Sequence, residues 1–194
     1  MAKLYFNYST MNAGKSTILL QAAHNYAERG QTPYLLNADF DVRSGTGSIT
    51  ARIGLKAPAD VYGPEDNLFE KIAARLAEEP IACTFVDEAQ WLSKDQVWQL
   101  AKAVDQLNVP VMCYGLRTDF QGELFPGSAT LLAIADHLRE IRTICHCGRK
   151  ATMVVRLGAD GQVQTSGAQI EVGGNDKYVT YCRKHWSELT HTPE

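Results

Sequence analysis

The fold of this chain of 194 residues is decided by residues 4–16, LYFNYSTMNAGKS. Aromatic and aliphatic side chains dominate residues 3–8, and this composition predicts a buried strand. Residues 15–29 carry apolar side chains at helical spacing and are followed by Gly30, a residue type that commonly ends helices. Residues 9–16 match the phosphate-binding pattern G-x-x-x-x-G-K followed by Ser or Thr, except that Ser9 replaces the first glycine. Strand, loop and helix in this order predict a site for nucleotide phosphates.

In this pattern the backbone N–H groups of the loop and the N-terminus of the helix surround the phosphates of a nucleotide. Lys15 is expected to neutralise oxygens of the β- and γ-phosphates, and the Ser16 hydroxyl to hold Mg²⁺. The sequence therefore predicts that ATP binds here with Mg²⁺. The loop residues of this expected site are Ser9, Thr10, Met11, Asn12, Ala13, Gly14, Lys15 and Ser16. A chance Gly-Lys-Ser at a helix start is the alternative, and the strand and helix on either side argue against it.

Two acidic residues follow a second buried strand, predicted over residues 81–86. Asp87 stands where a P-loop enzyme places the carboxylate that supports the metal, usually through its water shell. Glu88 lies beyond the strand end, where a carboxylate can take a proton from a hydroxyl group or water during phosphoryl transfer. Without the loop at residues 9–16, Asp87 and Glu88 would be interpreted as two solvated acids. With the loop they predict a catalytic base, Glu88, beside an ATP and Mg²⁺ site that also includes Asp87 and Gln90.

The other segments before residue 142 alternate between strand and helix patterns. Strands are predicted over residues 32–38 and 109–116, and helices over residues 65–79, 93–107 and 128–141. Ser93 and Gln96 form a capping-box pattern, and Ser128 is expected to cap the last of these helices. Residues 39–50 show no periodicity and predict a loop. This order predicts an α/β fold with a mainly parallel sheet and helices on both of its faces.

The character of the sequence changes near Arg142. We place a boundary there between a P-loop α/β domain, residues 1–142, and a small subdomain, residues 143–194. Residues 152–157 and 169–172 predict short strands in this subdomain, and Asp160-Gly161 predicts a turn.

Four soft metal ligands lie in the subdomain as a C-x-C pair and a C-x-x-H pair: Cys145, Cys147, Cys182 and His185. Four protein ligands complete a tetrahedral site and leave no open position for catalysis, so they predict a structural Zn²⁺. The ion would tie together both ends of residues 148–181. Because the first pair is C-x-C and not the commoner C-x-x-C, His146 is an alternative candidate for one of the four ligand positions.

Composition limits the other function classes. The chain is 45% hydrophobic and 21% charged, which is typical of a globular protein. It has no run near the roughly 20 apolar residues of a membrane span and no signal-peptide pattern, so we expect a cytoplasmic protein that does not bind membranes. Five cysteines in such a chain favour thiols or metal ligands over disulfides.

A net charge of −3, from 19 Lys and Arg against 22 Asp and Glu, predicts no binding to nucleic acid. The strongest alternative is a P-loop ATPase whose zinc module grips nucleic acid, which calls for a basic stripe with interleaved aromatic residues. The basic residues near the metal ligands form only a modest scatter: Arg142, Arg149, Lys150, Arg183 and Lys184. A third class, a regulator that binds without catalysis, would be expected to lack Lys15 or Glu88, and both are present.

Four segments, in their order and spacing, resemble the zinc-containing (type II) thymidine kinases of bacteria and of the animal cytosol. They are MNAGKS (11–16), VDEAQ (86–90), YGLRTDF (114–120) and GGNDKY (173–178), and the resemblance covers essentially the whole chain. It implies a P-loop core of the recombinase type with a zinc-binding lasso subdomain. It also implies transfer of the ATP γ-phosphate to the 5′-hydroxyl of thymidine, and of deoxyuridine, giving dTMP and ADP in the salvage of DNA precursors.

The resemblance also implies roles for individual residues. Glu88 matches the catalytic base, and Asp41 and Arg43 match a D-x-R pattern in a loop over the phosphates. Trp91 stands where relatives commonly have phenylalanine. The residues expected to contact thymidine are Met11, Trp91, Leu116, Phe120, Gln169, Ile170, Glu171, Val172, Gly173 and Tyr178, with residues 169–173 in the lasso over the base. Relatives are typically homotetramers inhibited by dTTP, so we expect both properties here.

Overall fold

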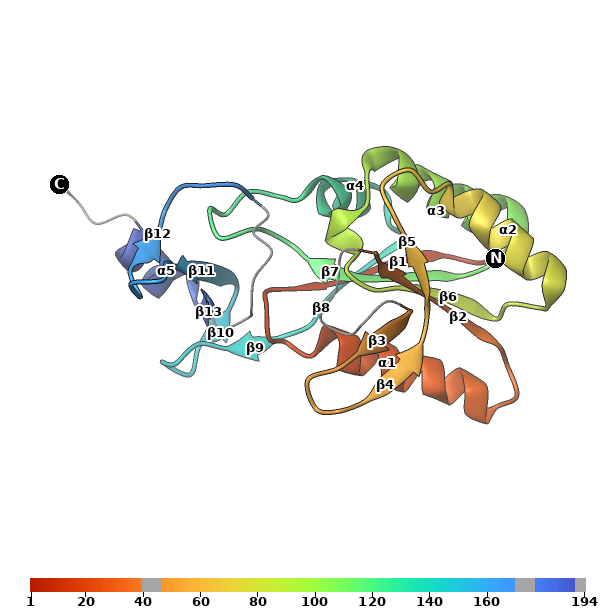
Figure 1. Cartoon of the computed structure of the whole chain (residues 1–194), viewed down its shortest axis with the longest axis horizontal. Helices are drawn as coiled ribbons and strands as arrows, with labels where there is room; N and C mark the ends of the chain where they lie inside the picture. The colour runs from red at the N-terminus through yellow and green to blue at the C-terminus, as the bar shows by residue number, and fades with distance from the viewer. Residues whose placement is uncertain (40–46, 170–176, 191–194) are drawn as a thin grey trace.

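The computed structural model describes residues 1–39, 47–169 and 177–190. Its centre is a six-stranded sheet in which neighbouring strands are parallel (Figure 1). In spatial order the strands are β5 (Asp60–Tyr62), β2 (Pro33–Ala38), β6 (Cys83–Val86), β7 (Val111–Leu116), β1 (Leu4–Ser9) and β8 (His137–Glu140). The strands predicted at residues 3–8, 32–38, 81–86 and 109–116 are confirmed.

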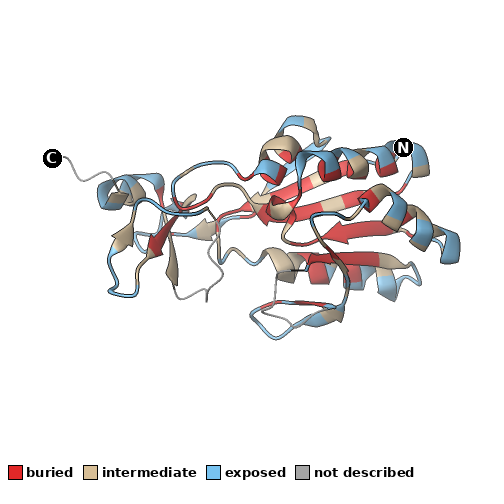
Figure 2. Ribbon diagram, turned by 45° about the horizontal axis from the view of Figure 1, so that its top comes forward, coloured by how far each residue is buried: buried red, intermediate tan, exposed pale blue. Residues whose placement is uncertain are grey.

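Helices cover both faces of the sheet, as predicted. Figure 1 shows α1 (Lys15–Glu28) on one face, and α2 (Leu68–Glu78), α3 (Lys94–Leu107) and α4 (Pro126–Ile134) on the other. Figure 2 shows that burial is concentrated in the strands and on the helix faces turned towards them. Leu19 of α1 belongs to the apolar cluster on the first face, and Ile72 of α2 and Leu100 of α3 belong to the cluster on the second. None of the described helices combines the length and apolar character needed to cross a bilayer.

The N-terminus of α3 forms the predicted capping box. The Ser93 hydroxyl accepts a hydrogen bond from the backbone N–H of Gln96, and Gln96 Oε1 accepts one from the backbone N–H of Ser93, both at 3.1 Å. Gln96 Nε2 also donates to the carbonyl of Gly63 at 2.8 Å, so the cap fastens α3 to the chain that leaves β5.

The helix predicted over residues 128–141 is wrong at both ends. The helix α4 begins at Pro126, where the missing N–H of proline costs no helical hydrogen bond, and it ends at Ile134. Ser128 lies inside α4 and donates from its hydroxyl to the carbonyl of Leu116 at 2.5 Å instead of capping the helix. Residues 137–140 form the edge strand β8, which pairs with β1. Pairing with a strand more than 100 residues away in the sequence overrides the local helical pattern.

The loop predicted over residues 39–50 is wrong at its end. Residues Ser48–Thr50 form β3, which pairs in an antiparallel hairpin with β4 (Lys56–Pro58). The side chain of Asn37 donates to the carbonyl of Ser48 at 3.2 Å and holds this hairpin beside β2. Strands of three residues are too short to show a period in the sequence.

The C-terminal part is built from short antiparallel strands. It contains β9 (Thr143–Ile144) paired with β10 (Lys150–Ala151), a sheet of β12 (Val163–Gln164), β11 (Met153–Leu157) and β13 (Tyr178–Tyr181), and the helix α5 (Arg183–Thr190). The strand predicted at residues 152–157 and the turn at Asp160-Gly161 are confirmed, whereas β13 and α5 were not predicted. In the strand predicted at residues 169–172, Gln169 is not in a strand, and residues 170–172 lie outside the described residues.

Candidate active site

The phosphate-binding loop connects β1 to α1, as the sequence predicts. Gly14 precedes the first residue of α1 with φ +83°, a left-handed conformation that glycine adopts at little cost. Ser9 is 3% exposed, and its hydroxyl donates to the carbonyl of Thr10 at 2.6 Å. Lys15 Nζ donates to Ser9 Oγ and to the Thr10 carbonyl, each at 3.3 Å. The serine that replaces glycine therefore supplies an oxygen that holds the Lys15 ammonium group inside the loop.

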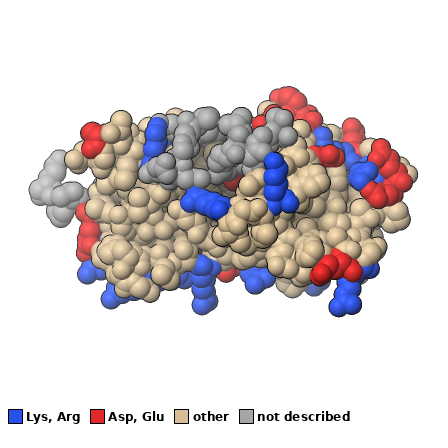
Figure 3. Space-filling model, turned by 60° about the horizontal axis from the view of Figure 1, so that its bottom comes forward, with Lys and Arg blue, Asp and Glu red and all other residues tan. Residues whose placement is uncertain are grey.

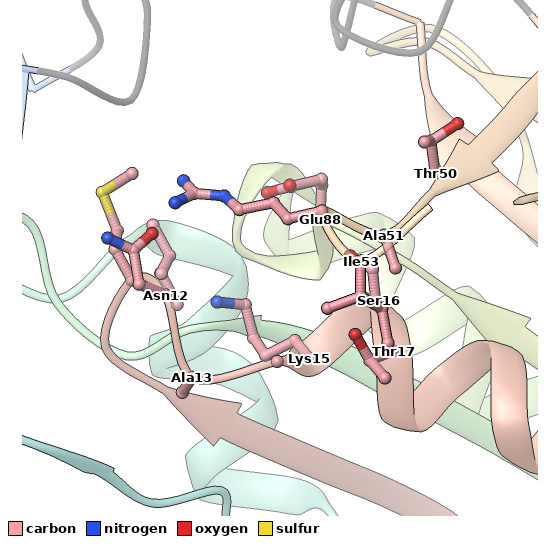
Figure 4. Close-up of a pocket in the computed structure, with 13 residues that line it drawn as sticks. Asn12, Ala13, Lys15, Ser16, Thr17, Thr50, Ala51, Ile53 and Glu88 are labelled. Carbon is pink, nitrogen blue, oxygen red and sulfur yellow. The ribbon is translucent and has the colours of Figure 1, made fainter. Parts of the chain in front are cut away.

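A pocket of about 380 Å³ lies over this loop (Figure 4). Residues 11–17 of the loop and the start of α1 form one wall, with Glu88 and Leu116 among the other lining residues. Figure 4 shows the Glu88 side chain across the pocket from Lys15 and Ser16. A carboxylate, an ammonium group and a helix N-terminus thus share one cavity, which is the arrangement that phosphoryl transfer requires.

Asp87 directly follows β6 and is 2% exposed. Burial, followed by the negative charge of Glu88, holds the pKa of Asp87 well above the usual range of an aspartate. The Ser16 hydroxyl, the backbone N–H of Glu88 and the Lys15 ammonium group act in the opposite direction and favour the carboxylate. A buried carboxyl group beside a hydroxyl group at the phosphate loop fits a hard divalent cation such as Mg²⁺.

Glu88 is held in a strained but well-supported conformation. Its φ of +52° lies in the left-handed region, which costs a non-glycine residue roughly 1–2 kcal/mol. The hydroxyl of Tyr62 donates at 3.0 Å to the carbonyls of both Asp87 and Glu88. Gln90 Nε2 donates to Glu88 Oε2 at 2.5 Å, while Gln90 Oε1 accepts from the backbone N–H of Leu116 at 2.9 Å. The Tyr62 hydroxyl therefore fixes the backbone at Glu88, and Gln90 fixes the Glu88 carboxylate at the pocket.

The structure brings only some of the predicted thymidine-contacting residues into this pocket. Met11 and Leu116 line it. The remaining described residues of this set lie elsewhere and do not line it: Trp91, Phe120, Gln169 and Tyr178. The predicted residues Asp41, Arg43, Ile170, Glu171, Val172 and Gly173 lie outside the described residues.

Several contacts lie near Phe120. Trp91 packs edge-on against Phe125 with ring centroids 5.1 Å apart. Gln169 Nε2 donates to Asp119 Oδ2 at 2.9 Å, one residue before Phe120. Phe120 itself is 2% exposed. Two of the predicted nucleoside residues, Phe120 and Gln169, are therefore neighbours through Asp119.

Sequence reasoning missed Arg52 and Tyr62. Arg52 lines the pocket from the turn between β3 and β4. This turn is closed by hydrogen bonds from Ala51 N to the Leu55 carbonyl at 2.8 Å and from Gly54 N to the Ala51 carbonyl at 2.9 Å. Gly54, at φ +91°, was the one local signal of a turn near Arg52. Tyr62 lies in the unpredicted edge strand β5, and no pattern near it pointed to the active site.

The four predicted metal ligands form one cluster, with all ligand atoms within 4.8 Å of one another. The Sγ atoms of Cys147 and Cys182 are 3.9 Å apart, and His185 Nδ1 is 3.4 Å from Cys145 Sγ and 3.5 Å from Cys182 Sγ. Tetrahedral Zn²⁺ with its usual bond lengths places two sulfur atoms about 3.8 Å apart and sulfur and nitrogen about 3.5 Å apart. The cluster therefore fits Zn²⁺.

His146 lies beside this cluster. Its ring stacks on that of His185 with centroids 4.4 Å apart, and its Nδ1 is 3.5 Å from Cys145 Sγ. The group of four that could hold an ion is complete with His185, and His146 packs against one of its members.

Comparison with known proteins gives full-length matches. A family model described as "Thymidine kinase" matches residues 2–186. The chain is 69% identical over 188 residues to a protein named thymidine kinase from Jannaschia sp., and the alignment covers 97% of this chain and 96% of the relative. It is 65% identical over 193 residues to one from Ruegeria pomeroyi, covering 100% of this chain and 98% of the relative. A more distant match from Pasteurella multocida is 55% identical over 188 residues, covering 97% of this chain and 98% of the relative.

Proposed function

The chain belongs to the thymidine kinase family and phosphorylates thymidine with ATP, and we propose that Glu88 is the base that receives the proton of the accepting 5′-hydroxyl. The observation that carries this proposal is the position of Glu88 in the same pocket as Lys15 and the N-terminus of α1. In the reaction the 5′-oxygen forms a bond to the γ-phosphorus, the bond to the leaving oxygen of ADP breaks, and the hydroxyl proton passes to Glu88. The product is dTMP.

We propose that the loop residues Ser9, Thr10, Met11, Asn12, Ala13, Gly14, Lys15 and Ser16 bind the phosphates of ATP. Mg²⁺, when bound, neutralises the phosphate charge, and the Ser16 hydroxyl and the buried carboxylate of Asp87 support it. Gln90 serves the site through its hydrogen bond to Glu88. Because this contact and the Tyr62 hydroxyl hold Glu88, little reorganisation is needed when the hydroxyl group arrives.

We add Arg52 to the phosphate-binding residues, alongside Asp41 and Arg43. Among the described residues, Arg52 and Lys15 are the cationic ones that line the pocket, and the turn that carries Arg52 is closed by two backbone hydrogen bonds. A guanidinium group at this position can contact two phosphate oxygens at once.

For the nucleoside we propose a site made of Met11, Leu116, Trp91, Phe120, Tyr178 and residues 169–173. Met11 and Leu116 give the pocket an apolar niche next to the phosphate loop, which suits the 5-methyl group of thymine and also admits deoxyuridine. The zinc cluster supports this site because Zn²⁺ on Cys145, Cys147, Cys182 and His185 would clip both ends of residues 148–181.

Two further proposals rest on the resemblance to the family. The enzyme is a homotetramer, and dTTP inhibits it by placing its base in the nucleoside site and its phosphates where those of ATP bind. The thiolates of the zinc cluster require a reducing compartment, which supports a cytoplasmic location.

The test is ADP release with Mg²⁺ and ATP in the presence of thymidine, deoxyuridine, deoxycytidine, deoxyguanosine or single-stranded DNA. We expect release with thymidine and deoxyuridine alone. On the face drawn in Figure 3, Lys and Arg side chains are spread out with acidic ones among them, which supports a nucleoside over a nucleic acid as the acceptor. Release that depends only on DNA would contradict the proposal.

A further inference from the structure

Arg156 is a buried arginine near the C-terminal end of β11, and the residue is 3% exposed. Three of its nitrogen atoms donate hydrogen bonds to the segment that follows the Asp160-Gly161 turn. Nε donates to Gln164 Oε1 at 2.7 Å, one terminal nitrogen to the Ala168 carbonyl at 2.8 Å, and the other to the Ser166 carbonyl at 3.3 Å. One side chain therefore fixes a stretch of five residues, 164–168. Residues 165–168 of this stretch are exposed to solvent.

The same guanidinium group lies over the ring of Phe120. Its central carbon is 3.8 Å from the ring centroid, which is the geometry of a cation–π contact. The backbone at Phe120 is also held, because Trp186 Nε1 in α5 donates a hydrogen bond to the Phe120 carbonyl at 3.1 Å. Arg156 thus links a residue of the P-loop domain to the C-terminal segment.

Two further hydrogen bonds join the residues around Phe120 to the segment that Arg156 fixes. Gln169 donates to the carboxylate of Asp119 at 2.9 Å, and Gln121 donates from Nε2 to the Thr165 carbonyl at 3.4 Å. The chain also passes very close to the guanidinium group at Gly167, where a Cβ atom would lie 2.3 Å from a terminal nitrogen of Arg156. Glycine at this position is needed both for that approach and for its φ of +133°.

We propose that Arg156 is a positioning residue for thymidine: it fixes Phe120 and residues 164–168, and with them the adjoining Gln169, so that Phe120 and Gln169 contact the nucleoside. The inference rests on the proposed function, because that function assigns Phe120 and Gln169 to the nucleoside site. Arginine is required for geometric reasons. Its planar fork reaches three acceptors while its face covers an aromatic ring, and a lysine ammonium group cannot do both.

The test compares Arg156→Met, Arg156→Lys and the control Arg142→Met, which changes an exposed arginine between β8 and β9. Methionine keeps most of the length and the packing on Phe120 but donates no hydrogen bond. The measurements are the Kd of thymidine by calorimetry, the KM values of thymidine and ATP, kcat, the zinc content and the Tm.

We expect Arg156→Met to raise the Kd and KM of thymidine at least tenfold, with the KM of ATP and the zinc content unchanged. Arg156→Lys should recover part of this loss, and Arg142→Met should behave as the unmodified enzyme. A thymidine Kd within twofold of the unmodified enzyme in Arg156→Met overturns the inference. A parallel loss of ATP binding, zinc and Tm also overturns it, because the role would then be structural.

A second pair of variants leaves Arg156 in place. Gly167→Ala and Gly161→Ala both put a side chain at a positive φ, but only the former meets Arg156, since no atom lies within 4 Å of the Cβ position at Gly161. Thymidine affinity should fall in Gly167→Ala and stay near normal in Gly161→Ala, and equal effects contradict the inference. If the unmodified enzyme itself fails to bind thymidine, the proposed function has failed instead.

Discussion

Gln90 Nε2 donates a hydrogen bond of 2.5 Å to the carboxylate of Glu88, and Gln90 Oε1 accepts one from the backbone N–H of Leu116 at the end of β7. Gln90 is 1% exposed, whereas Glu88 is partly buried and lines the pocket, so the contact holds the carboxylate at the edge of the cavity. A neutral donor beside the proposed base holds its carboxylate without competing for the proton of the substrate.

Replacing Gln90 with Glu isolates this contact. The carboxylate of Gln90→Glu keeps an acceptor for the Leu116 N–H but places a second negative charge against Glu88, so the base should turn away. We expect kcat to fall about tenfold or more, with little change in the KM of ATP. Steady-state kinetics measure both quantities, and an unchanged kcat would show that the contact does not orient the base.

Replacing Glu88 with Gln removes the proposed base at almost constant size. Turnover with thymidine should fall of order 100-fold or more, because the 5′-hydroxyl then has no group to receive its proton. The Kd of ATP should stay within about twofold, since the loop at residues 9–16 is intact. Glu70→Gln, at an exposed position of α2, is the matched control. Near-normal turnover in Glu88→Gln would remove Glu88 from this role.

Replacing Arg52 with Ala tests the phosphate contact added above. Loss of the cation proposed to bind two phosphate oxygens should raise the KM of ATP about tenfold, and Arg52→Lys should restore part of the affinity. Arg29→Ala, at the exposed end of α1, is the control with the same change of charge. Equal KM values for ATP in Arg52→Ala and in the control would contradict the assignment.

Replacing Cys182 with Ser removes one ligand of the metal cluster. Zinc content by elemental analysis should fall well below one ion per chain, the Tm should fall, and thymidine should bind more weakly. Cys113→Ala, in the buried strand β7, should keep its zinc and its affinity for thymidine. Full zinc content with unchanged thymidine affinity in Cys182→Ser would contradict the proposal that Zn²⁺ joins both ends of residues 148–181 and supports the nucleoside site.

The features that sequence reasoning found are those encoded locally. The loop at residues 9–16 and the cap at Ser93 each need only a few consecutive residues, so their geometry follows from their pattern. Asp87 and Glu88 were recognised because a buried strand precedes them in a chain that also carries the loop at residues 9–16.

What was missed depends on contacts between distant parts of the chain. The strand β8 forms only because β1 offers it an edge, and Tyr62 reaches Asp87 only because β5 joins the sheet on the other side of β2. Arg52 lines the pocket only because β3 and β4 pair with each other. Such placements require the tertiary structure, and local propensity does not encode them.

The order of strands also has a consequence for inhibitor chemistry. Since β7 lies between β1 and β6, the phosphate loop and Glu88 are separated by two strand spacings, about 10 Å. Leu116, at the end of β7, lies between them and lines the pocket. A single molecule that occupies both the donor and the acceptor positions must carry its phosphates from the loop at residues 9–16 to Glu88, passing along Leu116. A bisubstrate ligand with a nucleoside at each end and an anionic phosphate chain between them would therefore match the order of groups in the site.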